Sequence, residues 1–157
     1  MDEIIIRQKI ECVEKRCNYK FKNKETAKRA IIHQTFFTDN KVEGTSNFKE
    51  LACFGDSVLG FCVTDYLFNE LGISKKGTLN DRRKEFTNNE YLLKVAEDLK
   101  VEECLLLGKS ILNSKERINR VLASSIEALI GAIFIDGGYQ KVRRFVSEAI
   151  LKNRLVL

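Results

Sequence analysis

The chain has 157 residues, of which 44% are hydrophobic and 31% are charged. This length suits one domain, and the composition is that of an ordinary globular protein, which excludes a low-complexity or linker-like chain. The net charge of +5 is compatible with a polyanionic partner, although a solvated basic surface is the simpler explanation of charge alone.

The first half of the chain is predicted to be helical. Ile6, Ile10, Val13 and Cys17 recur at helical spacing, which predicts an amphipathic helix over residues 3 to 17. Asn23 is a candidate cap for a second helix from Lys24 to His33. Residues 38 to 47 read as a polar loop. A long apolar helix is then expected from about Phe48 to Leu71, with Gly72 as its C-terminal stop.

The second half continues the helical pattern. Helix is expected to resume near Leu79, and another helix is expected from about Asn89 to Leu99. Residues 105 to 119 read as a turn-rich connection. An apolar helix from about Val121 then ends at Asp136-Gly137-Gly138, and a last amphipathic helix is expected from Lys141 to Asn153. With short connections and no strand-like alternation, the sequence predicts an all-α fold, a helical bundle.

The cysteines and the N-terminus indicate a reducing, intracellular location, either cytoplasmic or nuclear. The five cysteines are odd in number and contain no C-x-x-C spacing, so we expect small core residues and not disulfides or a zinc site. Asp2 and Glu3 directly after Met1 argue against a signal peptide. We expect no membrane span, because one apolar run carries two aspartates and the other is too short.

Two apolar stretches each contain an isolated carboxylate. Asp56 lies within residues 51 to 68, where Asp65 is the only other charge, and Glu127 is the only charge in residues 121 to 135. Burying an ionised carboxylate is costly unless it is paired or binds a metal. The pattern therefore predicts an oxygen-ligand metal site between two core helices, although a buried acid bonded to backbone or serine is the alternative.

These stretches carry a resemblance to a known family. NFKELACFGDSVLG (residues 47 to 60) resembles the signature motif of the ribonuclease III family, and LASSIEALIGAIFIDGG (residues 122 to 138) resembles its second acidic motif. The resemblance implies an endonuclease domain of that family over residues 1 to 157, with no double-stranded-RNA-binding domain visible. It implies a homodimer that cuts double-stranded RNA with Mg²⁺, with Mn²⁺ as a second candidate cation. Cys53 and Phe54 stand where the resemblance implies a dimer socket contact.

The sequence departs from the family pattern in its acidic positions. Asp56 and Glu127 match the expected catalytic metal ligands, but Ala52 and Ser124 occupy the other two positions of the four. Lys49 also replaces a glutamate that the family often has. Glu50 is about 120° around the helix from Asp56 and does not compensate. Either the chain is a naturally silenced member, or an active enzyme has been altered at Ala52 and Ser124.

Four further residues are candidates for contacting RNA: His33, Lys76, Arg82 and Arg83. The competing explanations are a capping or surface histidine and a solvated basic helix face. We expect an Mg²⁺-dependent endoribonuclease with impaired cleavage. The alternatives are a non-catalytic module that binds RNA or a partner within a larger assembly, and a plain helical interaction domain without an RNA role.

Overall fold

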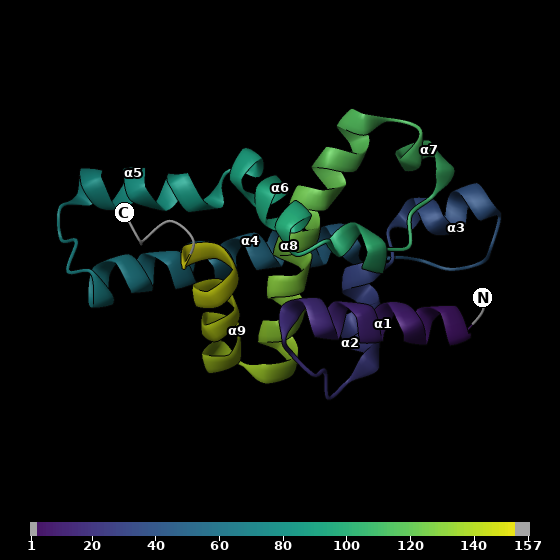
Figure 1. Ribbon diagram of the computed structural model, residues 1–157, viewed down its shortest axis with the longest axis horizontal. Coiled ribbons are helices and arrows are strands. Elements are labelled where there is room, and N and C mark those ends of the chain that lie inside the picture. The colour runs from purple at the N-terminus through teal and green to yellow at the C-terminus, as the bar shows by residue number, and fades with distance from the viewer. Residues whose placement is uncertain (1–2, 153–157) are drawn as a thin grey trace.

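The computed structural model describes residues 3–152, which form helices joined by short connections (Figure 1). In chain order the elements are α1 (Glu3–Cys17), α2 (Lys24–Ile31), α3 (Gln34–Asn40), α4 (Phe48–Asp65), η1 (Tyr66–Glu70), α5 (Lys76–Thr87), α6 (Asn89–Asp98), η2 (Val101–Cys104), α7 (Lys109–Leu112), α8 (Lys115–Gly137), α9 (Tyr139–Val146) and η3 (Ser147–Leu151). Among residues 3–152 the only strand-type pairing is one isolated bridge, between Ile32 and Leu106. The predicted all-α fold is confirmed.

Helix α8 is the centre of the fold, and α4 crosses it (Figure 1). Helices α2, α6 and α9 also pack on α8, which explains why most of its middle portion is buried. The crossing is close because glycines occupy it. A Cβ atom at Gly55 would lie 1.7 Å from the Glu127 carbonyl oxygen, and one at Gly131 would lie 2.7 Å from the Leu51 carbonyl oxygen. Glycine is therefore required for the backbones of α4 and α8 to touch.

Several helix ends follow the capping signals in the sequence. The Asn23 side chain accepts a hydrogen bond from the Glu25 N–H, as predicted, and Ser114 caps α8 by accepting from the Arg117 N–H. Gly72 follows the long apolar helix with φ +64°, a left-handed conformation that favours glycine. These local signals set where the elements begin and end.

Some predicted boundaries were wrong. The loop expected over residues 38 to 47 is partly helical, because α3 covers Gln34–Asn40 and is capped by His33. The second predicted helix accordingly ends at Ile31 and not at His33. The connection expected over residues 105 to 119 contains α7 and the first turn of α8. The end of the last predicted helix, at Asn153, lies outside the described residues.

The expectation that no cysteine forms a disulfide was wrong for one pair. Cys12 of α1 and Cys104 of η2 are bonded, with their Cα atoms 5.5 Å apart and a sequence separation of 92. Two contacts to Glu103 also hold α1 against η2: Lys9 Nζ donates to its carbonyl at 2.5 Å, and Arg16 pairs with its carboxylate. Only tertiary packing brings the two thiols together. Cys17 and Cys62 are free and buried, as expected. Cys53 is free but exposed, so the expectation that it is a core residue was wrong, because its side of α4 faces away from the core.

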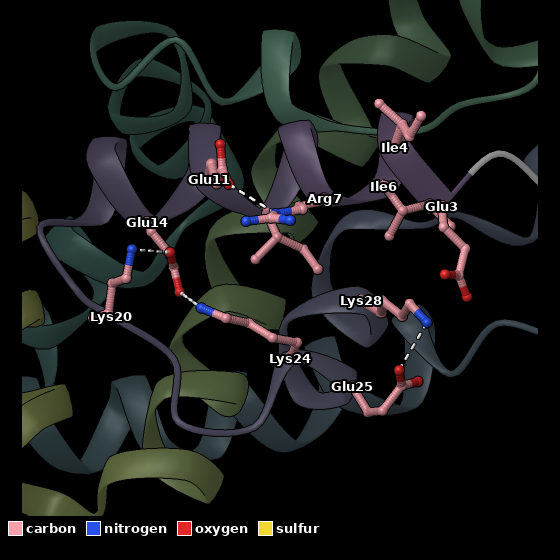
Figure 2. Close-up of a pocket in the computed structure, with 11 residues that line it drawn as sticks. Glu3, Ile4, Ile6, Arg7, Glu11, Glu14, Lys20, Lys24, Glu25 and Lys28 are labelled. Atoms are coloured by element: carbon pink, nitrogen blue, oxygen red, sulfur yellow. Dashed lines mark hydrogen bonds and ion pairs between the residues drawn. The ribbon is translucent and has the colours of Figure 1, made fainter.

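The segment between α1 and α2 is organised around a buried carboxylate. Figure 2 shows Lys20 and Lys24 pointing toward Glu14, whose side chain is almost fully buried. Oε1 accepts hydrogen bonds from Lys24 Nζ and from the Phe21 N–H, the latter at 2.9 Å. Lys20 Nζ lies 3.1 Å from Oε2 as an ion pair. Burial alone would raise the pKa of Glu14, but the bonds from Lys24, Phe21 and Lys20 outweigh it and lower the pKa.

The two long helices explain the apolar stretches in the sequence. Phe48–Glu70 and Lys115–Gly137 are each long and apolar enough to cross a membrane by length and composition. In this fold, however, they pack on each other and on their neighbours, and 61% of the apolar window of α8 is buried inside the protein. Core packing therefore accounts for the hydrophobicity of α8, whereas only 44% of the apolar window of Phe48–Glu70 is buried and part of its apolar surface is exposed.

Candidate active site

The α4–α8 crossing brings the two isolated carboxylates together. Gly55, next to Asp56, packs directly on the backbone of Glu127. The Glu127 side chain is half-buried, and burial followed by the charge of Asp56 raises its pKa to about 7. The two carboxylates are therefore close enough to influence each other electrostatically, although they are 71 positions apart in the sequence.

The two carboxylates differ in exposure. Asp56 is exposed, so the expectation that it is buried was wrong. The reason is its position on α4: Gly55, and not Asp56, points at α8. No hydrogen bond or ion pair joins either carboxylate to another residue between 3 and 152. The alternative of an acid held by backbone or serine therefore has no support within the described residues.

The other two positions of the expected acidic cluster lie beside Glu127. Ala52 is buried at 6% exposure, and Ser124 is partly exposed. Both line a cavity of about 350 Å³ between the first halves of α4 and α8. We name it the α4–α8 cavity; its lining residues are His33, Phe48, Lys49, Ala52, Cys53, Arg120, Val121, Ser124 and Glu127. Glu50 is exposed and is not part of this lining, which agrees with its predicted orientation.

Asp56 lines a second depression, which lies between α4 and α5. This depression has a volume of about 560 Å³ and is also lined by Arg83, Lys84 and Thr87 of α5. Of the basic residues predicted to contact RNA, Arg83 therefore lies beside the acidic site. Arg82 points elsewhere and pairs with Glu85 at 3.1 Å, and Lys76 is exposed at the start of α5, outside the depression.

His33 is buried and caps a helix. Its Nδ1 accepts a hydrogen bond from the Thr35 N–H at 3.3 Å, which supports the capping explanation but not a surface position. The ring nevertheless lines the α4–α8 cavity. Burial and the nearby charge of Lys49 lower its pKa, against an opposing effect of Asp39, so the ring is neutral at pH 7.

An exposed aromatic row runs along α4 and η1. Phe54, Phe61 and Phe68 are 42%, 59% and 53% exposed and are spaced seven residues apart, so they lie on one side of the helix. We name this set the phenylalanine stripe. Phe54 packs edge-on against Phe134, and Phe61 packs against Tyr139, which hold the first two rings in place. Three exposed aromatic side chains on one side of a helix are a candidate interaction surface.

The described residues do not fit a cluster of paired metal ions. Nowhere in residues 3–152 do three or more His, Cys, Asp or Glu side chains converge as metal ligands. Mg²⁺ can be held by one or two carboxylates when substrate phosphates and water complete its shell. Asp56 and Glu127 therefore suit at most a single, substrate-assisted ion.

The comparisons with known proteins agree on one family. The family model for ribonuclease-III-like proteins matches residues 23–154. A ribonuclease 3 of Bdellovibrio bacteriovorus is 31% identical over 146 residues, covering 92% of this chain and 62% of that protein. The chain belongs to the ribonuclease III family. A ribonuclease 3 of a Wolbachia of Brugia malayi is also 31% identical, over 87% of this chain and 56% of its own length.

Solved structures of the family share this fold. The nuclease domain of ribonuclease III from Campylobacter jejuni, in a study of flexibility in its dimer-forming region, aligns with a TM-score of 0.81 and 27% identity. The alignment covers 93% of this chain and 99% of that domain. By contrast, this chain spans only about 60% of the length of the two ribonuclease 3 relatives above. The family resemblance predicted from residues 47 to 60 and 122 to 138 is confirmed.

One residue of the candidate site was missed from the sequence. Arg120 lines the α4–α8 cavity, on the same face of α8 as Ser124 and Glu127. The spacing of four and then three residues places the three side chains on one ridge. That spacing could have predicted Arg120 as a lining residue, but only with the knowledge that Glu127 faces α4.

Proposed function

We propose that this chain is a ribonuclease III-type domain that acts on double-stranded RNA as a homodimer, with impaired Mg²⁺-dependent cleavage. The observation that carries the proposal is the pairing of Asp56 and Glu127 across the α4–α8 crossing in a member of this family. Asp56 and Glu127 offer metal-binding groups from two helices, and Arg83 of α5, which lines the same depression as Asp56, offers a phosphate-binding group.

The loss of cleavage follows from charge. In phosphodiester hydrolysis, bound Mg²⁺ supplies a more acidic water and stabilises the leaving oxygen. Ala52 and Ser124 provide no negative charge to hold such ions, and Asp56 and Glu127 alone do not fit the paired arrangement. Mn²⁺ is the second candidate cation, since it shares the preference for carboxylate and water ligands.

The homodimer part of the proposal rests on the phenylalanine stripe. Phe54, Phe61 and Phe68 present an apolar surface along the helix that carries Asp56. A second copy of the same surface would cover it, and two-fold contacts of this kind are the commonest arrangement of homodimers. The position of Phe54 in this stripe agrees with the dimer contact that the resemblance implies for Cys53 and Phe54.

The test is cleavage of a long labelled RNA duplex with Mg²⁺ by this chain and by its Ala52→Glu/Ser124→Asp variant. We expect slow or no cleavage by the chain as it stands and efficient cleavage by the restored variant. Adding Asp56→Asn to the restored variant is the control, because it should abolish the recovered activity while leaving the fold intact by circular dichroism. Normal turnover of the unaltered chain at low Mg²⁺ would refute the impairment.

A second candidate function is favoured by the absence of a three-ligand cluster in residues 3–152. It is a non-catalytic ribonuclease III-like module that binds RNA or a protein. If neither variant cuts, although both are folded dimers that bind the duplex, this function replaces the first. Absence of duplex binding at low salt, where phosphate contacts are strongest, would exclude an RNA role altogether.

A further inference from the structure

The α4–α8 cavity has the composition of an anion site. Its polar lining contains two permanent cations, Lys49 and Arg120, together with the Ser124 hydroxyl and the His33 ring. The cavity lining includes Lys49, Ala52 and Ser124, three positions where the family resemblance predicts carboxylates. The cavity of about 350 Å³ has room for a phosphate group and several waters, since one water takes up about 30 Å³.

His33 supplies a buried donor to this cavity. The side chain is only 6% exposed, and Phe48 packs against its ring with the centroids 5.3 Å apart. Because Nδ1 accepts from the Thr35 N–H, the proton of the neutral ring sits on Nε2. No residue of the described chain accepts a hydrogen bond from Nε2. The His33 ring lines the cavity, and the helix cap fixes its orientation and leaves the Nε2–H as its free donor.

Lys49 and Arg120 lie on the two helices that wall the cavity. Lys49 is three residues before Ala52, and Arg120 is four before Ser124, so each cation lies on the same helix face as a small residue. Lys49 is close enough to His33 to affect the charge of its ring, and it forms no ion pair within residues 3–152. Arg120 bonds to Glu116, which leaves further N–H donors of its guanidinium available.

One carboxylate also lines the cavity. Glu127 lies at the crossing with α4, seven residues from Arg120, which corresponds to about 10 Å along an ideal helix. Its electrostatic partner is Asp56, on the side that faces α5. The positive and negative ends of the site are thus separated by the small side chains Ala52 and Ser124.

We propose that the α4–α8 cavity binds a phosphate group directly, through Lys49, Arg120 and His33, with no metal ion between. The inference rests on the proposed function for the source of that phosphate, the backbone of an RNA duplex. In this chain, cationic side chains attract the phosphate group directly, in place of metal ions held by carboxylates. Ala52 and Ser124 leave the space in which the phosphate oxygens lie.

The first test uses inorganic phosphate and the single histidine of the chain. The imidazole signals of His33 are followed by NMR during a phosphate titration in EDTA, with chloride at equal ionic strength as the blank. We expect a saturable shift at millimolar phosphate, weakened at least about fivefold in Lys49→Ala and in Arg120→Ala. Lys115→Ala is the matched control, because it removes an exposed cation of α8 outside the cavity. No shift, or equal shifts in all variants, overturns the proposal.

The second test uses an RNA duplex in EDTA, measured by fluorescence anisotropy at several salt concentrations. We expect Lys49→Ala to weaken binding roughly fivefold to tenfold and to reduce the slope of log affinity against log salt by about one, as for loss of one phosphate contact. Binding that requires Mg²⁺, or that is unchanged in Lys49→Ala, contradicts the proposal.

The two tests separate this inference from the proposed function. If phosphate shifts the His33 signals through Lys49 and Arg120 but no duplex binds, the phosphate site stands and the RNA function fails. If the duplex binds but Lys49 and Arg120 contribute to neither measurement, the RNA function stands and the phosphate site fails. Circular dichroism of each variant confirms that a loss of binding is not a loss of fold.

Discussion

Gly55 of α4 lies directly against the backbone carbonyl of Glu127 in α8, so close that a Cβ atom at Gly55 would be 1.7 Å from that oxygen. The neighbouring atom is backbone and cannot rotate away. Gly55 is therefore the residue that sets the distance between the two helices carrying Asp56 and Glu127. The same contact therefore affects both the stability of the core and the relative positions of Asp56 and Glu127.

Replacing Gly55 with alanine should consequently destabilise the protein. We expect Gly55→Ala to lower the free energy of unfolding by about 3 kcal/mol, at the upper end of overpacking effects, because α4 and α8 must separate. Gly60→Ala is the control on the same helix, where a Cβ meets nothing within 4 Å. It should be neutral or stabilising by up to about 1 kcal/mol, since alanine favours helix. Urea unfolding measures both, and equal midpoints would contradict the prediction.

The pKa of Glu127 makes stability depend on pH. Burial and Asp56 raise this pKa from 4.5 to about 7 in the folded protein. Between these values the folded state holds a proton that the unfolded state has released, so stability falls as pH rises from about 4.5 through 7. We expect Glu127→Gln in EDTA to be more stable than the unaltered chain at pH 8, by on the order of 1–2 kcal/mol after solvent screening.

As pH falls below 4.5, the same substitution should lose its advantage, because Glu127 becomes protonated in both states. The measurement is urea unfolding of the two proteins at pH 4.5, 6 and 8. If the stability difference does not vary across this pH range, ionisation of Glu127 does not destabilise the folded protein, and the prediction is wrong.

Glu14 should be a stabilising residue, unlike Glu127. Its buried carboxylate accepts from the Phe21 N–H and pairs with Lys20 and Lys24. Removing it leaves a buried N–H without an acceptor, so we expect Glu14→Ala to cost about 2–3 kcal/mol. Its lowered pKa means that this stabilisation is present above pH 4.5 and is lost as pH falls below it.

Glu11→Ala is the matched control for Glu14→Ala. Glu11 lies on the same helix but forms an exposed pair with Arg7, which contributes well under about 1 kcal/mol. Thermal unfolding at pH 7 compares the two variants. Equal melting temperatures would show that the Glu14 network does not hold the α1–α2 connection.

The phenylalanine stripe predicts how the proposed dimer can be broken. Phe61 is the most exposed member, at 59%, and a glutamate there would place a charge inside the interface. Since buried aromatic anchors commonly contribute about 2 kcal/mol, we expect Phe61→Glu to weaken dimerisation at least about tenfold. Sedimentation velocity gives the dissociation constant. Leu112→Glu, at a residue 50% exposed on α7, should leave the dimer intact.

The family and the all-α class were readable from sequence because they depend on local, repeated signals. Apolar spacing along residues 3 to 17 predicted α1, Asn23 predicted a cap, and Gly72 predicted a helix stop. The two long motifs also made Asp56 and Glu127 recognisable as a pair. Each of these inferences rests on residues within one helix or on a recognised pattern, so no knowledge of packing was needed.

Tertiary structure decided which side of each helix faces which neighbour. The sequence predicted a buried Asp56, but packing of Gly55 on α8 turns Asp56 outward and leaves Glu127 half-buried. The Cys12–Cys104 bond could not be predicted from the sequence either, because the two cysteines have a sequence separation of 92. The cluster of Lys49, Arg120 and His33 comes from α4, α8 and the connection between α2 and α3. Such contacts are long-range, and their geometry is fixed only when the core packs.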